Sequence, residues 1–254
     1  MSLFDLTGRV AIVTGGNGGI GLGMAQGLAR AGASLTIVGR NSVKNDQAQL
    51  RLNKLGAKVL VLEKDITDLT APAEIIAATQ NEFGRIDILI NNAGSSIRKR
   101  PEDLTSEDFR WVLETNLTSA FLCSQSVYPV LKKAGGGKII NIGSMYSLFG
   151  APAVTAYAVS KGGLVQMTKS LATAWAQDRI QVNAILPGWI DTELTQNARE
   201  QIDGLYERQL ARIPDGRWGT PEDHEGIAVF LASSASNYIT GTAIPVDGGF
   251  SISG

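Results

Sequence analysis

Short apolar runs rich in β-branched residues alternate along this chain with longer segments whose apolar residues recur at helical spacing. The runs that fit strands are Val10–Val13, Ser34–Val38, Lys58–Leu62, Ile86–Ile90, Lys138–Ile142, Gln181–Leu186 and Thr242–Val246. Most of them are apolar throughout, and helical patterns separate most of them, as in a parallel sheet with helices on both faces. The alternation predicts a doubly wound α/β fold around a seven-stranded parallel sheet.

The helical patterns between the strands indicate one domain. They include Leu22–Arg30, Lys44–Leu55, Ala73–Phe83 and Ser106–Leu131. Nothing between them resembles an interdomain linker, so we predict a single domain over residues 1–254.

One long segment, Trp189–Pro214, departs from this rhythm, because it is polar, helix-prone and placed directly after a strand. Ligands bind beyond the carboxyl ends of parallel strands, where a long insertion can cover them. This segment, around residues 189–214, is therefore a candidate substrate lid. The alternative is a surface helical excursion without function.

Composition narrows the classes of partner. Hydrophobic residues make up 44% of the 254 residues, and the net charge of −1 gives no reason to expect a nucleic acid or a membrane surface as partner. Cys123 is the only cysteine, so no intrachain disulfide can form, and with a single His the chain offers no Cys and His cluster for a metal. No signal peptide and no membrane-spanning stretch is recognisable. We expect a cytoplasmic protein without a metal site.

A glycine-rich turn, Thr14-Gly15-Gly16-Asn17-Gly18-Gly19-Ile20-Gly21, follows the first strand directly. Glycines let the backbone approach a pyrophosphate, whose charge is met by the free amides and positive dipole of the next helix. The position between a strand and a helix favours a dinucleotide site of the Rossmann type over a tight turn without a ligand. The candidate cofactor contacts are Gly15, Asn17, Gly18, Gly19, Ile20 and Gly21.

The end of the second strand helps to choose between nicotinamide cofactors. An acidic residue there would bind the adenosine ribose of NAD, but this chain has Gly39, Arg40 and Asn41. The guanidinium of Arg40 suits a 2′-phosphate, and we include Asn41 beside it as a candidate contact. We favour NADP(H), and NAD(H) stays as the alternative because an arginine can also stack on adenine without choosing between them.

Tyr157 and Lys161 are four residues apart, so a helix would stack the phenol and the ammonium on one face. A fixed cation beside a phenol favours phenolate and lowers its pKa, which makes it a proton donor and acceptor near neutral pH. The spacing arises readily by chance, so the hypothesis depends on the motifs around it.

Further motifs fall in order along the chain: Asn91-Asn92-Ala93-Gly94 after the fourth strand, Asn116 in the following helix, Ser144 after the fifth strand, and Pro187-Gly188 after the sixth. With Tyr157, Lys161 and the glycine turn, this set resembles the short-chain dehydrogenase/reductase family from about Gly8 to Gly249. The ordered combination carries the resemblance. It implies an oxidoreductase that interconverts a secondary alcohol and a ketone by hydride transfer with NAD(P)(H).

The resemblance implies a role for each matching residue. Tyr157 would exchange a proton with the substrate oxygen, Lys161 would hold the nicotinamide ribose and lower the Tyr157 pKa, and Ser144 would orient the substrate oxygen. Asn116 would interrupt its helix around a water that links Lys161 to solvent, although an Asn in a helix also bonds simply to a neighbouring loop. The remaining cofactor positions are Asp65, Ile66, Asn92, Ala93, Gly94, Pro187, Gly188, Ile190 and Thr192, and Met145 and Trp189 join the substrate positions.

Within the family, three basic stretches are similar to the sugar-acid and polyol branch, such as gluconate or deoxygluconate dehydrogenases. They are Ile97-Arg98-Lys99-Arg100, Arg212-Ile213-Pro214 and Gly216-Arg217-Trp218-Gly219. Positive side chains near the crevice would hold a substrate carboxylate or equally serve subunit contacts or solvation. The run of three basic residues by itself is most simply a solvated loop. The apolar Met145 and Trp189 fit a less polar substrate equally, such as a small cyclic ketone.

Two other functions stay open, a 3-oxoacyl thioester reductase and a dinucleotide-binding sensor without chemistry; loss of Tyr157 or Lys161 would be the mark of the sensor. His224 follows a helix start capped by Thr220, and we expect it to be exposed.

Apolar positions on more than one face of Ser106–Leu131 and of the helix with Tyr157 indicate a further partner, and the family usually forms dimers and tetramers through these helices. We expect a homotetramer.

Overall fold

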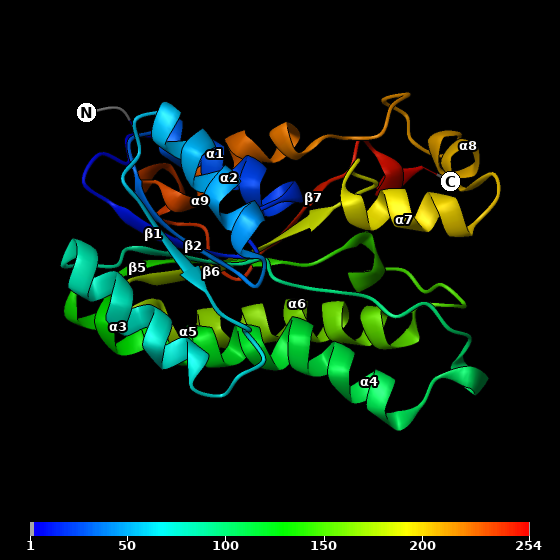
Figure 1. Cartoon of the computed structure of the whole chain (residues 1–254), viewed down its shortest axis with the longest axis horizontal. Helices are drawn as coiled ribbons and strands as arrows, with labels where there is room; N and C mark the ends of the chain where they lie inside the picture. Colours follow the sequence, from blue (N-terminus) through cyan, green and yellow to red (C-terminus); the bar gives the residue numbers. More distant parts are fainter. Residues whose placement is uncertain (1–2, 254) are drawn as a thin grey trace.

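The computed structural model describes residues 3–253 and contains one seven-stranded sheet in which all neighbouring strands pair in parallel (Figure 1). The strands are β1 Val10–Thr14, β2 Ser34–Gly39, β3 Val59–Glu63, β4 Ile88–Asn91, β5 Gly137–Ile142, β6 Ile180–Pro187 and β7 Ala243–Val246. Their order in space is β3-β2-β1-β4-β5-β6-β7. The doubly wound fold is confirmed, and each strand lies within about two residues of its predicted ends.

Helices cover both faces of this sheet. They are α1 Gly19–Arg30, α2 Ser42–Lys54, α3 Ala71–Phe83, α4 Ser106–Leu113, α5 Ser119–Lys133, α6 Thr155–Trp175, α7 Glu193–Gln201, α8 Leu205–Leu210 and α9 Glu225–Ala232. Figure 1 shows α1, α2 and α9 on one side of the sheet and α3 to α6 on the other, while α7 and α8 stand at one end. None of the helices in residues 3–253 has the length and apolar character that crossing a membrane requires.

Local signals in the sequence set the ends of these helices. The Thr105 side chain accepts a hydrogen bond from the Asp108 amide and the Asp108 carboxylate accepts one from the Thr105 amide, so α4 begins with a capping box. Gly84 ends α3 with a φ of +75°, a left-handed conformation that a side chain would disfavour. Helix ends of this kind are recognisable before the packing is known.

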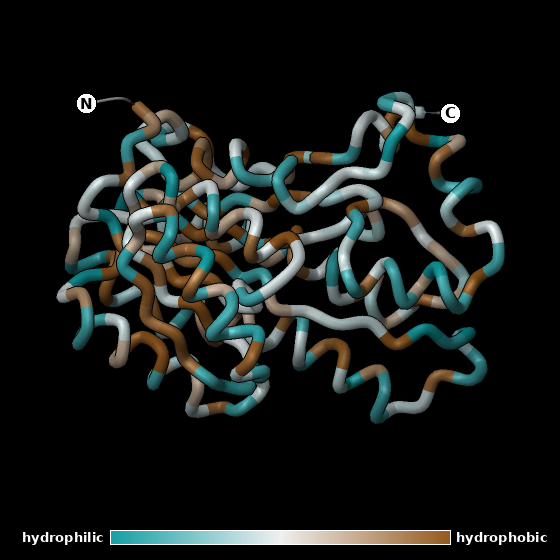
Figure 2. Tube along the Cα trace, turned by 45° about the horizontal axis from the view of Figure 1, so that its top comes forward, coloured by the Kyte–Doolittle hydropathy of each residue, from teal (hydrophilic) through white to brown (hydrophobic). Residues whose placement is uncertain are grey.

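Two apolar layers hold the helices on the sheet. One joins strand residues such as Val13 and Ile37 to α1 and α9, and the other joins Ile12 and Leu89 to α3, α5 and α6. In Figure 2 the colour of apolar residues runs along the strands inside the molecule. Each fully buried aliphatic side chain contributes roughly 1.5–3 kcal/mol relative to exposure, so these layers dominate the stability of the fold.

The strand order changes direction between β1 and β4, and this fixes where a ligand can bind. β1 pairs with β2 on one side and with β4 on the other, so the chain leaves these neighbouring strands toward opposite faces. The Thr14 hydroxyl at the end of β1 accepts hydrogen bonds from the Asn92 amide at 3.0 Å and the Ala93 amide at 3.1 Å. The crevice beyond these carboxyl ends is the place where doubly wound sheets bind their ligands.

The predicted helical segment Ser106–Leu131 is not continuous, in agreement with the interruption expected at Asn116. A π-helical turn, Glu114–Thr118, separates α4 from α5. Hydroxyls bond back to the helix on either side, from Thr115 to the Trp111 carbonyl at 2.8 Å and from Ser119 to the Thr115 carbonyl at 2.7 Å. A π-helical turn contains one residue more than an α-helical turn, and such turns frequently occur at functional sites.

A buried carboxylate ties β1 to β4 at the opposite edge of the sheet. Asp87 accepts hydrogen bonds from Arg9 at 2.7 Å, from Arg85 at 2.6 and 2.8 Å, and from the Val10 amide at 3.0 Å. Burial by itself raises the pKa of Asp87, but these donors together outweigh it and hold the pKa below its usual value of 3.8. The ionised carboxylate is therefore part of the folded structure.

We expect Asp87→Asn to lower the free energy of unfolding by about 2 kcal/mol at pH 7. The folded pKa of Asp87 lies below the unfolded one, so the stabilisation is fully present above the unfolded value and is lost as the pH falls through the folded value. Urea titrations should therefore show the difference from the unchanged protein shrinking toward pH 3. Asp46→Asn, on the exposed side of α2, is the control. Equal losses at both pH values would contradict the role of the charge.

Candidate active site

A cavity of about 1240 Å³ lies in this crevice, between the glycine turn and the segment that carries α7 and α8. Most residues predicted for the site line it. These are Gly15, Asn17, Gly18, Gly19, Ile20, Arg40, Asp65, Ile66, Asn92, Ala93, Gly94, Ser144, Met145, Tyr157, Lys161, Pro187, Gly188, Trp189, Ile190 and Thr192. Residues from seven separate stretches of sequence thus meet in one space.

Three predicted site residues do not line the cavity. The Asn41 side chain caps α2 instead, by accepting a hydrogen bond from the Lys44 amide at 2.9 Å, so its prediction as a cofactor contact is not supported. Gly21 allows the turn itself, because a Cβ there would lie 2.3 Å from the Gly15 carbonyl oxygen. Asn116 lies behind the wall, in the π-helical turn.

The glycine turn fits a pyrophosphate. Gly15 has a φ of +62°, and a Cβ there would approach Asn92 Nδ2 to 2.9 Å, so only glycine lets these two loops meet. Gly18, the N-cap of α1, brings no side chain into the turn, no side chain caps the helix, and the first turn carries no acidic residue. The first amides of α1 therefore stay available to an anion in the cavity.

Two cations stand at the far end of this groove. Arg40 lies 3.4 Å from the Asp65 carboxylate, and both side chains are about half exposed. Lys44, in the first turn of α2, forms an ion pair with Glu193 at the start of α7. The sequence analysis missed Lys44; its position four residues after Arg40 was the signal that could have found it.

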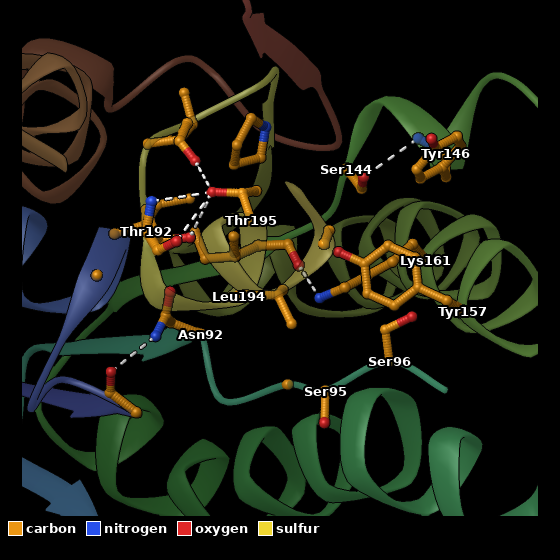
Figure 3. Close-up of a pocket in the computed structure, with 18 of the residues that line it drawn as sticks. Asn92, Ser95, Ser96, Ser144, Tyr146, Tyr157, Lys161, Thr192, Leu194 and Thr195 are labelled. Atoms are coloured by element: carbon orange, nitrogen blue, oxygen red, sulfur yellow. Dashed lines mark hydrogen bonds between the residues drawn. The ribbon is translucent and has the colours of Figure 1, made fainter. Parts of the chain in front are cut away.

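Tyr157 and Lys161, the pair predicted to carry the chemistry, lie on α6. Lys161 is only 4% exposed, its Nζ donates a hydrogen bond to the Ile142 carbonyl at 2.6 Å, and it lies 5.7 Å from the centre of the Tyr157 ring. Figure 3 shows Tyr157 and Lys161 beside each other, with Ser144 and Tyr146 on the neighbouring segment. Ser144 begins a short 3-10 turn after β5 and accepts a hydrogen bond from the Tyr146 amide at 3.2 Å. The predicted trio meets at one point of the cavity.

Burial dominates the electrostatics of this pair. It lowers the pKa of Lys161 to about 8, because no carboxylate within residues 3–253 pairs with the ammonium. It also raises the pKa of Tyr157, and a hydrogen bond with Ser144 opposes that rise without reversing it. Desolvation of the phenol therefore sets the direction of the shift, and a lowering of the Tyr157 pKa by Lys161 stays a prediction.

Asn116 joins the loop after β4 to α6. Its Oδ1 accepts a hydrogen bond from the Ser95 amide at 2.8 Å, and its Nδ2 donates to the Ser95 carbonyl at 2.9 Å and to Ser160 Oγ at 3.0 Å. A Cβ on Gly94 would lie 3.2 Å from Asn116 Oδ1 and 3.4 Å from Lys161 Nζ. The interrupted helix and the bond to a neighbouring loop are thus both present, and the water relay stays a prediction.

Aromatic and basic side chains form the other end of the cavity. Tyr146, which the sequence analysis missed, lies 6.2 Å from Tyr157 and 6.4 Å from Trp189, measured between ring centres. Arg98 and Arg212 also line the cavity, and neither has an acidic partner within the described range. The Arg212 guanidinium lies 4.4 Å from the centre of the Phe250 ring. This end offers an apolar wall and two uncompensated positive charges.

The prediction that His224 is exposed is wrong. It is 0% exposed, its Nδ1 lies 3.4 Å from the Thr220 carbonyl, and burial lowers its pKa. The capped helix start was predicted correctly, but that turn packs on α1, where a Cβ on Gly23 would lie 2.2 Å from the Pro221 carbonyl oxygen. His224 does not line the cavity. No group of three His, Cys, Asp or Glu side chains in residues 3–253 is arranged to hold a metal.

Known proteins match this chain over nearly its whole length. Residues 15–251 match a family model described as enoyl-(acyl carrier protein) reductase. The chain is 43% identical to 2-dehydro-3-deoxy-D-gluconate 5-dehydrogenase of Dickeya dadantii (strain 3937), over 98% of both chains. It is 39% identical to gluconate 5-dehydrogenase of Gluconobacter oxydans (strain 621H), over 99% of this chain and 98% of the relative.

Solved structures agree with these relatives. A proposed NAD(P)-dependent gluconate 5-dehydrogenase from Beutenbergia cavernae, which holds NADP at low occupancy, superposes with a TM-score of 0.93 at 39% sequence identity. The superposition covers 99% of this chain and 100% of that one. The likeness extends beyond the nucleotide half to the segment that carries α7 and α8.

We expect Lys161→Met to raise the free energy of unfolding by about 2 kcal/mol at pH 7, because it removes a buried ammonium without a counter-charge. The folded pKa of about 8 lies below the unfolded value of 10.5, so the penalty is fully present below pH 8 and disappears as the pH rises to 10.5. Urea titrations at pH 7 and pH 10.5 measure the difference. Lys169→Met, exposed on the same helix, is the control. A gain that persists at pH 10.5 would refute this explanation.

Proposed function

The chain belongs to the short-chain dehydrogenase/reductase family of NAD(P)(H)-dependent oxidoreductases, which interconvert secondary alcohols and ketones, and from this premise we propose that it acts on a sugar acid. The observation that carries the proposal is the pair of uncompensated cations, Arg98 and Arg212, at the substrate end of the cavity. A carboxylate is the natural partner for two guanidinium groups. Relatives named as gluconate and deoxygluconate dehydrogenases support the same substrate class.

We assign the proton transfer to Tyr157. Bound NADP(H) supplies or accepts the hydride at the substrate carbon. Because burial raises the pKa of Tyr157, its phenol is protonated at neutral pH and gives its proton to the oxygen of a ketone as that oxygen gains negative charge. In the opposite direction the phenolate takes the proton from the alcohol. Ser144 donates a hydrogen bond to the same oxygen and orients it.

Lys161 and Asn116 assist the proton transfer by Tyr157. An ammonium has three N–H donors, and the Ile142 carbonyl takes one of those of Lys161, which leaves two for the hydroxyls of a nicotinamide ribose. A pKa near 8 also lets Lys161 release and regain a proton near neutral pH. The contacts of Asn116 with Ser95 and Ser160 support a role in holding the neighbouring loop for a proton path to solvent.

We propose NADP(H) as the preferred cofactor. Arg40 and Lys44 both line the nucleotide end of the cavity, and two cations suit a 2′-phosphate better than a ribose hydroxyl. Asp65 and Glu193 pair with them, so charge is balanced before a phosphate arrives. The relative from Beutenbergia cavernae, with its bound NADP, supports this preference.

Three further expectations, on assembly, compartment and a lid, stay proposals. Trp111 on α4 and Phe121 on α5 are each 39% exposed, and Val159 on α6 is exposed too, which supports subunit contacts through these helices in a homotetramer. A single buried cysteine, Cys123, with burial raising its pKa to about 12, fits a reducing compartment such as the cytoplasm. The segment Trp189–Pro214 is proposed to act as a lid over the substrate.

We expect Tyr157→Phe to lower kcat by about 10²–10⁴-fold, because the phenyl ring keeps the packing but cannot transfer a proton. Titration of intrinsic fluorescence with NADP should give an unchanged Kd. Tyr238→Phe changes a fully exposed tyrosine outside the cavity and serves as the control. Substantial turnover in Tyr157→Phe would rule out its role in proton transfer.

The substrate class is tested by screening gluconate, deoxygluconates, neutral polyols, cyclic alcohols and 3-hydroxyacyl thioesters with NADP and with NAD. We expect the sugar acids to give the highest kcat/KM, with NADP preferred. Arg212→Gln and Arg98→Gln should each raise KM for the acids about 10- to 100-fold and leave neutral polyols little changed, because only a carboxylate loses a charged partner. Arg208→Gln, exposed on α8, is the control. Equal losses for acids and neutral polyols would exclude a carboxylate site.

A further inference from the structure

The helix over the cavity is held by polar contacts rather than by an apolar face. None of the residues of α7 is buried, although Leu194, Thr195 and Ala198 line the cavity. Thr195 donates a hydrogen bond to the Ile190 carbonyl at 2.6 Å, and Glu193 pairs with Lys44. A helix without buried side chains gains little from packing, so individual polar contacts decide how firmly it stays in place.

Arg199 makes the most extensive of these contacts. Its guanidinium pairs with the Asp191 carboxylate and lies 5.0 Å from the centre of the Trp218 ring and 5.5 Å from that of Tyr206. Asp191 lies in the loop after β6, Trp218 is a core residue, and Tyr206 belongs to α8. One side chain of α7 therefore joins three parts of the fold, and a planar cation between an anion and two rings is strongly oriented.

The rings that Arg199 touches lead to the reacting tyrosine. Trp218 lies 5.2 Å from Trp189, Trp189 lies 6.4 Å from Tyr146, and Tyr146 lies 6.2 Å from Tyr157, all between ring centres. Trp189 and Tyr146 both line the cavity. The position of Arg199 over Trp218 thus bears on the wall against which a substrate would pack.

The interface between α8 and Trp218 is not secured by hydrogen bonds of its own. Trp218 lies 5.0 Å from Tyr206 of α8, measured between ring centres, and Leu210 of α8 packs against the same apolar cluster. Its Nε1 and the Oε1 of Gln209 are both buried, and neither has a hydrogen-bond partner in the described part of the chain. Unpaired buried polar atoms weaken an interface, so the cation above the Trp218 ring gains importance for holding the segment closed.

We propose that Arg199 is a positioning residue that latches the lid, residues 189–214, over the substrate end of the cavity. It acts through Trp218, which lies outside the lid and supports the Trp189 wall. Asp191, within the lid, holds the guanidinium in place. The proposal rests on the lid assignment made above and needs no particular substrate. The latch lowers KM by keeping a bound substrate from leaving, and it takes no part in proton or hydride transfer.

Kinetics separate a latch from a catalytic group. We expect Arg199→Ala to raise KM for the best alcohol substrate about tenfold while kcat stays within twofold of the unchanged enzyme. Arg199→Lys keeps the charge but loses the planar stacking and should restore KM in part. Asp191→Asn, which removes the anion and keeps the size, should raise KM less than Arg199→Ala. Arg208→Ala, on the same segment without these contacts, is the matched control and should behave like the unchanged enzyme.

A second measurement needs no substrate. Brief digestion with chymotrypsin, followed by mass spectrometry, reports cleavage within residues 193–210. We expect Arg199→Ala to be cleaved at least fivefold faster there than Arg208→Ala, with a melting temperature close to that of the unchanged protein, because α7 buries nothing. If Arg199→Ala does not fold, the Arg199→Lys and Asp191→Asn variants carry the same comparison.

The outcomes distinguish the latch from the proposed function. KM and cleavage in Arg199→Ala that match Arg208→Ala would overturn the latch, as would a fall in kcat with an unchanged KM. Rejection of all sugar acids would overturn the proposed substrate, but faster cleavage in Arg199→Ala would still support the latch. Faster cleavage with unchanged KM for every accepted alcohol would also overturn the proposal, because the segment would then open without affecting the substrate.

Discussion

The active site depends on the parallel pairing of β1 with β4, two strands that are far apart in the chain. Because the chain leaves these neighbours toward opposite faces, no helix crosses the space beyond their carboxyl ends. The Thr14 hydroxyl accepts hydrogen bonds from the Asn92 and Ala93 amides and so fixes the two loops at that edge. A side chain at Gly15 would collide with Asn92 and open this contact. The glycine turn, the floor of the cavity and the approach to Lys161 all follow from this one arrangement.

A buried charged group lies at each edge of the sheet, and only one of the two has partners of opposite charge among residues 3–253. At the amino edge, Asp87 is surrounded by Arg9, Arg85 and a backbone amide, and its pKa is held low. At the carboxyl edge, Lys161 is buried with one carbonyl and no carboxylate, and its pKa falls to about 8. The first arrangement stabilises the fold at neutral pH, while the second costs stability. A fold retains such a cost where the uncompensated group has a function, which agrees with the proposed role of Lys161 in binding a cofactor and helping to move a proton.

The sequence predicts the strands of the parallel sheet and most of the residues that line the cavity, because apolar periodicity and motif order both arise from the backbone path. It fails where packing between distant elements decides the outcome. His224 follows a correctly predicted helix cap, yet the close approach of that turn to α1 buries it completely. Asn41 follows the second strand, but its side chain caps α2 and does not line the cavity. The rise in the Tyr157 pKa was missed because spacing shows the neighbouring cation but not the loss of water around the phenol.

The polar character of α7 has a physical reason. A helix that buried an apolar face over the cavity would stay closed, since opening would expose that face to water at a cost that grows with its area. Arg199 instead joins Asp191 and two rings through a contact that water can replace at low cost, and Glu193 does the same with Lys44. Such contacts break and form again far more easily than a packed apolar face. The same polarity that interrupts the strand-and-helix rhythm of the sequence therefore suits the proposed lid, which has to hold a substrate and release its product.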